Sequence, residues 1–355
     1  MIQKSNATVE INLAKLKQNL QTLRSYLNED TRVMSVVKAD AYGHGALEVA
    51  STLEPMVDAF AVNDIHEGIE LREQGIAKPI LVFEVPQKTI ASQYRIHNLT
   101  ATVSAKEHFD WLPNGTSYHL NFDTGMGRLG FAPEEVERVL SLVEENNNLF
   151  CTGLYSHFAT ADSPGSDFVR EQLRLFSTIR EQFPQKLLAH IANTGATAFY
   201  SDEQQFDMVR LGIGLYGYAP GKTSIEDISP ILQWKSKLVQ VKPIVEQSTV
   251  SYGATWQAPA DGNLGIIPVG YDDGLKRSLS KELTVRINGE QYPLVGTITM
   301  NYSMVFLGDD KYKAGTPVQL LYAESNARHW ASKINTIPYE ILTSVNPKIP
   351  REYIL

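Results

Sequence analysis

The feature that most constrains the fold is an alternation over residues 8–225, in which short β-branched runs are separated by amphipathic stretches. Parallel strands need long crossover connections, and helices of this kind supply them. Eight strand–helix units favour a sheet that closes on itself. The sequence therefore predicts an α/β fold with a (β/α)8 TIM barrel. The predicted strands are 32–37, 57–62, 80–85, 100–104, 117–122, 151–156, 187–192 and 207–209.

Turn and capping residues mark the ends of the helices between these strands. Gly75 follows an apolar helical pattern and is a plausible stop, because glycine adopts the left-handed conformation at helix ends. Pro133, followed by two glutamates, is typical of a first helical turn. The predicted helices are 45–53, 64–74, 133–145 and 166–183.

After about residue 228 the pattern changes to strands joined by turns, which predicts a mainly antiparallel β domain. Asn288-Gly289 lies between two β-branched runs and is a strong hairpin signal. An early segment, 7–12, is predicted to be a strand of this second domain. We therefore expect a barrel at 8–227 and a β domain at 228–355 that also takes residues 1–10. The predicted β-domain strands are 236–243, 248–252, 265–269, 283–287, 291–295, 302–307 and 317–322.

Composition excludes several classes of protein. With 355 residues, 43% hydrophobic and 20% charged, the chain has the make-up of a globular protein and not of a disordered one. A net charge of −8 without a basic stripe argues against nucleic acid and anionic membranes as partners. Cys151 is the single cysteine, so we predict neither an internal disulfide nor a cysteine metal site, and we assign no metal ligands. No run of 18 apolar residues occurs, and a cytoplasmic enzyme is expected.

Polar residues gather where the predicted barrel strands end, the usual place of barrel active sites. A lysine follows the first strand, and a glycine-rich segment follows the last, where backbone N–H groups bind phosphate in this fold. A lysine opposite a phosphate cradle suggests a phosphorylated aldehyde held as a Schiff base. Pyridoxal phosphate and a sugar phosphate both fit. The residues are Lys38, Asn121, Arg128, His157, Asn193, Thr194, Arg210, Gly212 and Ile213.

Several ordered motifs resemble those of bacterial alanine racemases. The first, Val37-Lys38-Ala39-Asp40-Ala41-Tyr42-Gly43-His44-Gly45, resembles the cofactor-lysine motif of that family. The likeness implies pyridoxal phosphate as cofactor, an amino acid as substrate, D-alanine supply for peptidoglycan, and a head-to-tail homodimer with shared active sites. Further matching motifs begin at Asn121, Ser156, His190, Met208, Val250, Pro268 and Thr336.

The resemblance assigns two catalytic bases. Lys38 would hold the cofactor and then act on one face of the substrate, and Tyr252 of the other subunit would act on the opposite face. Racemisation removes a proton from one face and delivers one to the other, which two opposed bases provide. A phenol ionises near pH 10, so Tyr252 needs nearby positive charge or hydrogen bonds to lower its pKa.

The same resemblance assigns binding roles. Arg210 would donate to the pyridine nitrogen and leave it unprotonated, which weakens the ring as an electron sink and favours reprotonation at Cα over transamination. Arg128 and the Met300 backbone would bind the substrate carboxylate, and Tyr271 would narrow the entrance. The other residues assigned to the cofactor are Tyr42, His157, which orients Arg210, Asn193, Thr194, Gly212, Ile213 and Tyr339.

The chain departs from the family pattern in three motifs. Many members carry a carbamylated lysine where this chain has Asn121, which bears no charge. We expect either an anion such as chloride beside Asn121 and Arg128, or a less rigid Arg128. The family's Cys-Met-Asp reads Thr299-Met300-Asn301, and its Tyr-Ala-Asp-Gly reads Tyr271-Asp272-Asp273-Gly274. These changes affect substrate range and rate more than reaction type.

Other functions remain open at the level of sequence. The changed entrance residues are compatible with a racemase for serine or for a broader range of amino acids. A related decarboxylase fits less well, because position 210 is arginine and not an acid. A non-catalytic pyridoxal-phosphate carrier or a sugar-phosphate aldolase leaves the second domain unexplained.

Overall fold

The computed structural model describes residues 6–201, 203 and 205–355. The chain divides into two compact units, which are treated separately below. We call residues 16–41 and 45–229 the barrel unit, and residues 1–15, 42–44 and 230–355, described from Asn6 onward, the β unit. The predicted boundary between 227 and 228 stays a prediction. In the described residues, no helix is long and apolar enough to cross a membrane.

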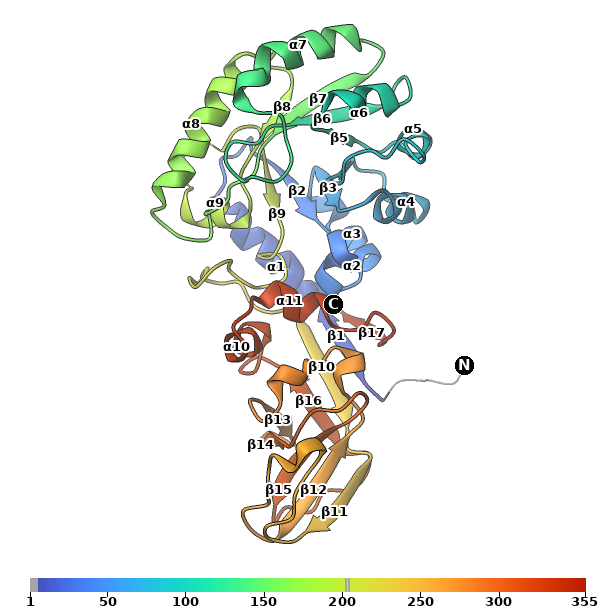
Figure 1. Ribbon diagram of the computed structural model, residues 1–355, viewed down its shortest axis with the longest axis vertical. Helices are drawn as coiled ribbons and strands as arrows, with labels where there is room; N and C mark the ends of the chain where they lie inside the picture. Colours follow the sequence, from blue (N-terminus) through green and yellow to red (C-terminus); the bar gives the residue numbers. More distant parts are fainter. Residues whose placement is uncertain (1–5, 202, 204) are drawn as a thin grey trace. The chain divides into compact units, whose positions relative to one another are not determined.

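Within its described residues, the barrel unit contains eight parallel strands in two four-stranded sheets, ordered β4-β3-β2-β9 and β5-β6-β7-β8 (Figure 1). Bridges Leu81↔Thr100 and Asn193↔Arg210 join the two sheets at both seams, which confirms the predicted (β/α)8 barrel. The strands are β2 (Arg32–Val36), β3 (Ala59–Val62), β4 (Ile80–Val82), β5 (Ala101–Val103), β6 (Ser117–Asn121), β7 (Phe150–Tyr155), β8 (Leu188–His190) and β9 (Met208–Leu211).

The helices of the barrel unit follow the predicted capping signals. Asp64 caps the helix that follows β3 and accepts hydrogen bonds from the His66 and Glu67 N–H groups. Gly75 stands two residues past that helix with φ 97°, as expected for a stop. Pro133 opens a 3₁₀ turn, Pro133–Glu135, before the helix proper. The helices are α1 (Leu13–Arg24), α3 (Ala46–Leu53), α4 (Ile65–Glu73), α5 (Ser92–Ile96), α6 (Lys106–Trp111), α7 (Val136–Glu145), α8 (Asp167–Glu181) and α9 (Thr194–Phe199).

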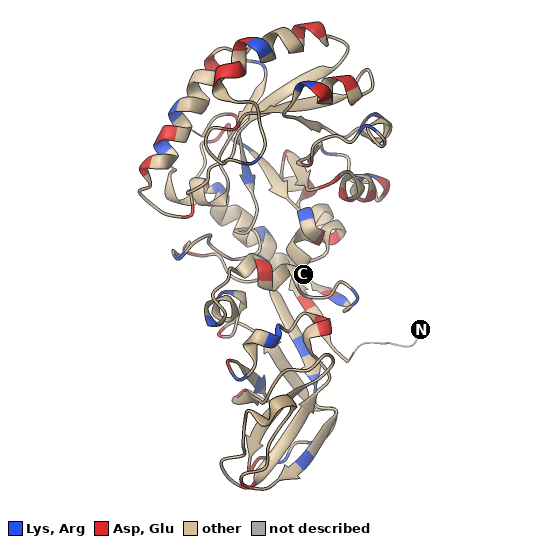
Figure 2. Ribbon diagram, viewed as in Figure 1, with Lys and Arg blue, Asp and Glu red and all other residues tan. Residues whose placement is uncertain are grey.

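The longest helices separate apolar from charged faces. In α8, Val169, Phe176 and Ile179 are buried. Charges of both signs alternate along the rest of this helix, and α7 also carries charged residues (Figure 2). This is the amphipathic pattern of a helix that covers a sheet, because only one of its faces reaches the core.

The β unit is built on a nine-stranded sheet of order β11-β12-β15-β14-β13-β16-β10-β1-β17. Its N-terminal strand β1 pairs antiparallel with β10 and parallel with β17, which confirms the early strand predicted for this domain. Asn288 (φ 51°) and Gly289 (φ 93°) form the predicted two-residue hairpin turn between β13 and β14. The strands are β1 (Thr8–Asn12), β10 (Leu232–Lys237), β11 (Gln240–Ile244), β12 (Gly262–Ile267), β13 (Thr284–Ile287), β14 (Glu290–Val295), β15 (Ser303–Gly308), β16 (Pro317–Leu321) and β17 (Arg351–Ile354).

Two predicted strands of the β domain are wrong. The single strand expected at 236–243 is two, because the chain leaves β10 after Lys237 and enters β11 at Gln240. The strand expected at 248–252 is reduced to one antiparallel bridge, Thr249↔Gln257. Ser251 has φ 67°, outside the β region, and its hydroxyl donates to the Thr297 carbonyl oxygen at 2.6 Å. Elements that the strand pattern missed are α10 (Ala327–Lys333), α11 (Pro338–Thr343) and β17.

Candidate active site

A cavity of about 310 Å³ lies in the barrel unit at the carboxyl ends of its strands. We call it the carboxyl-end cavity. Arg210 belongs to β9 itself, because that strand runs to Leu211, past its predicted end at 209. The structure thus brings together five of the residues singled out in the sequence. Those that line the cavity are Lys38, Asn121, Arg128, His157 and Arg210.

Lys38 stands at the start of a left-handed helical turn, α2 (Lys38–Gly43). Ala39, Asp40, Ala41 and Tyr42 have φ between 51° and 56°. This conformation costs roughly 1–2 kcal/mol per non-glycine residue, so contacts must hold it in place. The Glu67 carboxylate accepts hydrogen bonds from the N–H groups of Ala39 (2.5 Å) and Asn63 (2.7 Å), and the Asp40 carboxylate accepts from Ala46 N–H (2.8 Å). These contacts support the backbone that presents Lys38.

The surroundings of Lys38 favour the neutral amine. Burial lowers the pKa of Lys38, the positive charge of Arg128 lowers it further, and the Glu67 carboxylate opposes both. The Lys38 Nζ lies 5.6 Å from the centre of the Phe83 ring. Because a deprotonated amine is the nucleophile in Schiff-base chemistry, this environment suits Lys38 to attack a carbonyl carbon.

Arg210 is held rigidly by the barrel interior. It is 3% exposed, and burial lowers its pKa to about 10, so it remains charged near neutral pH. Its NH1 donates to His190 Nδ1 (2.7 Å), and its NH2 donates to His157 Nδ1 (3.0 Å) and the Ser156 carbonyl oxygen (2.8 Å). Among the described residues, its Nε has no protein acceptor. Arg210 can therefore offer its Nε–H group to a ligand in the cavity.

These contacts determine which nitrogen of each histidine carries the proton. Arginine only donates, so His157 and His190 must both accept at Nδ1 and carry their hydrogen on Nε2. Burial and then the charge of Arg210 hold the pKa of both imidazoles well below the usual range, which keeps them neutral. His190 also stacks on the Tyr155 ring, with centroids 5.0 Å apart.

Arg128 lies at the end of a loop that one carboxylate organises. The Asp123 side chain accepts hydrogen bonds from the N–H groups of Gly125, Gly127 and Arg128. At the strand end, the Asn121 side chain donates to the Leu129 carbonyl oxygen at 3.0 Å. The carboxylate and this amide together shape the loop that positions Arg128 beside the cavity.

The predicted phosphate residues after β8 and β9 also lie together. Thr194 Oγ1 accepts from Gly212 N–H at 3.0 Å, and Gly214 must be glycine because a Cβ there would meet the Thr194 methyl at 2.6 Å. Asn193 caps α9 and accepts from Ala196 N–H. Ile213 is buried, and its N–H has no acceptor in the described part of the chain. A buried donor of this kind is suited to an anion.

The remaining predicted residues belong to the β unit and differ in burial. Tyr42 and Tyr339 are near neighbours, with ring centroids 5.9 Å apart. In contrast, Tyr252, Tyr271 and Met300 are 73%, 43% and 54% exposed. The predicted site residues thus form one group in the barrel unit and another in the β unit.

Sequence reasoning missed three residues that organise the barrel group. Glu67 lies on α4, remote from any motif considered, and no local pattern indicates that it reaches Ala39. Asp123 precedes a glycine-rich loop, where aspartate typically accepts backbone N–H groups, so this signal was present. His190 lies within a matched motif, but its partner Arg210 is known only from the structure.

Comparisons with known proteins agree over both units. The family models described as "Alanine racemase, N-terminal domain" and "Alanine racemase, C-terminal domain" match residues 11–220 and 231–353. An alanine racemase of Streptococcus pneumoniae serotype 19F is 34% identical over 360 aligned residues, covering 97% of this chain and 96% of that protein.

Solved structures show the same likeness. The alanine racemase of Clostridium difficile 630 superimposes with a TM-score of 0.94 at 32% identity, covering 99% of this chain and 96% of that one. The alanine racemase from E. faecalis superimposes with a TM-score of 0.93 at 29% identity over the full length of both chains.

Proposed function

This chain belongs to the alanine racemase family, and from that premise we propose that it interconverts L- and D-alanine with pyridoxal phosphate as cofactor. The observation that carries the proposal is the carboxyl-end cavity, where a lysine with lowered pKa lines the same cavity as a buried arginine. We place the reaction in the cytoplasm as a source of D-alanine for peptidoglycan.

The barrel unit has features that fit pyridoxal phosphate. Lys38 offers an amine to the aldehyde, and Arg210 Nε offers a single N–H to the pyridine nitrogen. Thr194, Gly212 and the unpaired Ile213 N–H suit the phosphate, a role that we also assign to Asn193 and to the β-unit residues Tyr42 and Tyr339. When bound, the cofactor supplies a conjugated ring that stabilises negative charge at the substrate's Cα.

The chain's own residues would then move the protons and hold the substrate. We assign proton transfer at one face of Cα to the Lys38 amine and at the other face to the Tyr252 hydroxyl. Arg128 and the Met300 backbone bind the substrate carboxylate, and Tyr271 narrows the entrance. His157 orients Arg210, whose permanent charge keeps the pyridine nitrogen unprotonated and disfavours transamination.

A homodimer with shared active sites would explain the exposure of the β-unit group. Two backbone hydrogen bonds hold the segments of Tyr271 and Met300 together. Tyr271 N–H donates to the Thr299 carbonyl oxygen, and Asp272 N–H donates to the Met300 carbonyl oxygen. Tyr252 and Tyr302 line a neighbouring hollow and are also exposed. Exposed aromatic groups of this size mark association surfaces. If the partner's Tyr252 completes each site, specific activity should fall on dilution in step with dissociation measured by sedimentation.

Asn121 carries a separate proposal. We expect an anion beside Asn121 and Arg128 to replace the charge that a carbamylated lysine supplies in other members. Activity should then depend on halide at low ionic strength, and Asn121→Lys should weaken that dependence. Activity that does not change in chloride-free buffer would leave Asn121 as the donor to Leu129 O alone.

The direct test of the function is a chiral assay. The purified protein supplemented with pyridoxal phosphate should convert L-alanine to D-alanine and absorb as a lysine-bound pyridoxal, and Lys38→Ala should lose both properties. Comparing kcat/KM for alanine, serine, lysine and arginine tests the substrate, because Asp272 and Asn301 depart from the family pattern near the entrance. A higher kcat/KM for another amino acid would overturn alanine as the substrate.

A further inference from the structure

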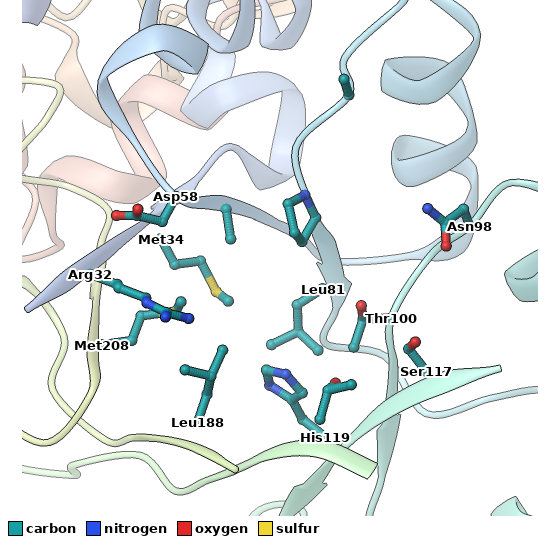
Figure 3. A pocket seen from close by; sticks show the side chains of 14 residues that line it. Arg32, Met34, Asp58, Leu81, Asn98, Thr100, Ser117, His119, Leu188 and Met208 are labelled. Atoms are coloured by element: carbon teal, nitrogen blue, oxygen red, sulfur yellow. The ribbon is translucent and has the colours of Figure 1, made fainter. Parts of the chain in front are cut away.

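A second cavity, of about 350 Å³, lies at the opposite end of the barrel (Figure 3). We call it the amino-end cavity, because five strands contribute their first residue to its wall and residues just before other strands complete it. It shares no lining residue with the carboxyl-end cavity. Its volume falls at the lower end of the range for small-molecule sites, so its ligand must be small. The five first residues are Arg32, Ala59, Ser117, Leu188 and Met208.

The wall of the amino-end cavity is apolar on one side and polar on another. Met34, Leu188 and Met208 present aliphatic and thioether groups to the same space (Figure 3). The hydroxyls of Thr100 and Ser117 lie together at another edge. A ligand for such a cavity needs an apolar body and a polar end.

The cavity carries one guanidinium. Arg32 lines it, and in the described residues its side chain has no ion-pair or hydrogen-bond partner. Asp58 also lines the cavity, but its carboxylate accepts from Val33 N–H at 2.8 Å. Asp58 lies at an edge well away from His119 in Figure 3. Arg32 is exposed and lies on the same side of the cavity as Asp58 in Figure 3, so its charge can reach an anionic ligand at this rim of the cavity.

His119 also lines the cavity, and Arg210 determines indirectly which of its ring nitrogens carries the hydrogen. Its Nδ1 lies 2.9 Å from His190 Nε2. Because Arg210 donates to His190 Nδ1, the His190 hydrogen is on Nε2 and is donated to His119 Nδ1. His119 must then carry its own hydrogen on Nε2. The chain of contacts Arg210–His190–His119 thus makes His119 Nε2 a hydrogen-bond donor.

The structure leaves this donor without an acceptor. His119 is 5% exposed, yet among the described residues its Nε2 has no protein partner. Burial lowers the pKa of His119 to about 4, so the imidazole is neutral near neutral pH. A Cβ at position 153 would lie 2.8 Å from Nε2 and 2.7 Å from Leu188 O, so glycine at this position allows the imidazole to pack against β7. His119 lines the cavity, so its Nε2–H group can donate to a ligand bound there.

We propose that the amino-end cavity binds a small monocarboxylate with an apolar body. One carboxylate oxygen accepts from His119 Nε2–H, and Arg32 supplies the opposite charge. The body packs on Met34, Leu188 and Met208. This site is separate from the proposed reaction and does not depend on it.

Calorimetry on the full-length protein loaded with pyridoxal phosphate tests the site. The probe is 4-methylpentanoate, and its uncharged control is 4-methylpentanamide. Arg128→Gln serves as the background protein, since a carboxylate also suits Arg128 in the carboxyl-end cavity. We expect saturable binding of the acid to this background and at least tenfold weaker binding of the amide.

Matched substitutions locate the binding. Arg32→Gln should weaken binding of 4-methylpentanoate at least tenfold. In the protein with Arg128 intact, the same substitution should leave racemase activity within twofold, because Arg32 lies far from Lys38. His119→Phe should abolish binding, whereas His119→Gln keeps an N–H donor and should stay within a few fold. Should His119→Phe fail to fold, Leu188→Phe, which fills the cavity, should weaken binding instead.

Two results would overturn the proposal. One is the absence of saturable binding to both the unchanged protein and the Arg128→Gln background. The other is binding that Arg128→Gln removes and Arg32→Gln leaves intact, which would place the carboxylate in the carboxyl-end cavity. A negative racemase assay would not affect either binding measurement, because calorimetry measures binding alone.

Discussion

The two groups of predicted site residues differ in how the chain holds them. In the barrel unit, Arg210 and Thr194 are 3% and 4% exposed, and each is tied to its neighbours by hydrogen bonds. In the β unit, Tyr252 and Met300 are more than half exposed. The barrel group is thus organised by its own unit, whereas the exposed group needs a further surface to be buried. Cofactor binding is therefore expected without the exposed residues Tyr252 and Met300, whereas complete racemisation is expected to need them.

The largest expected effect is the loss of activity in Lys38→Ala, which tests whether the barrel group holds the reaction. Removal of the amine should reduce racemisation about 10⁴-fold, because it removes a base as well as the cofactor's anchor. Lys88→Ala, at an exposed lysine of the same unit, is the control. Activity near the wild-type level in Lys38→Ala would exclude this lysine from the chemistry.

Tyr252→Phe tests whether the exposed group takes part. Loss of the hydroxyl should reduce racemisation about 10²- to 10³-fold, while Lys38 continues to exchange the Cα proton of one enantiomer with solvent. Deuterium incorporation into L- and D-alanine, measured separately, should therefore become unequal. Tyr302→Phe is the matched control on the same unit. Equal incorporation at an unchanged rate would show that Tyr252 is not the second base.

The burial of the barrel group predicts a pH dependence of stability. His119 has a pKa of about 4 when folded. In the unfolded chain its pKa is about 6.5, so the unfolded state binds a proton between these values that the folded state does not. The stabilisation is present above the unfolded pKa and is lost as pH falls through the folded pKa, by about 3 kcal/mol in all.

Urea unfolding at neutral and at mildly acidic pH measures this dependence. His119→Gln should lose less stability than the wild type on acidification, whereas His66→Gln, at an exposed histidine, should behave like the wild type. Identical losses in all three proteins would mean that His119 is not buried in its neutral form.

The smallest expected effect is a shift of about tenfold in the ratio of transamination to racemisation in Arg210→Glu. The ratio is measured because loss of the Arg210 hydrogen bonds also lowers the overall rate. An acid at this position favours a protonated pyridine nitrogen, which strengthens the ring as an electron sink and should raise transamination relative to racemisation. Pyruvate and D-alanine formation are measured in the same reaction, with Arg210→Lys as the charge-retaining control. An unchanged ratio would refute the electronic argument.

Much of the fold was predictable from local patterns. Short β-branched runs identified the eight barrel strands, and Gly75, Pro133 and Asn288-Gly289 marked turns because their backbone preferences act over a few residues. The strand expected at 248–252 was wrong because a contact with a distant residue overrode the local preference. Its β-branched composition favoured a strand, but the Ser251 contact with Thr297 O, 46 residues away, holds a loop.

Part of the candidate site was also accessible from sequence. Motifs and strand ends placed Lys38, Arg128, His157 and Arg210 at one end of the barrel, and these residues do line one cavity. Glu67 was not found, since its contact with Ala39 joins residues 28 positions apart and leaves no periodic signal.

The amino-acid sequence by itself determined the strand and helix pattern, the turns and the identity of the reactive groups, because these depend on near neighbours and residue chemistry. Only the tertiary structure decided which nitrogen of His119 carries a proton. That property passes from Arg210 through His190 to His119, over separations of 20 and 71 residues. Barrel closure brings these side chains within hydrogen-bonding distance, and the direction of each bond then follows from the one group that can only donate.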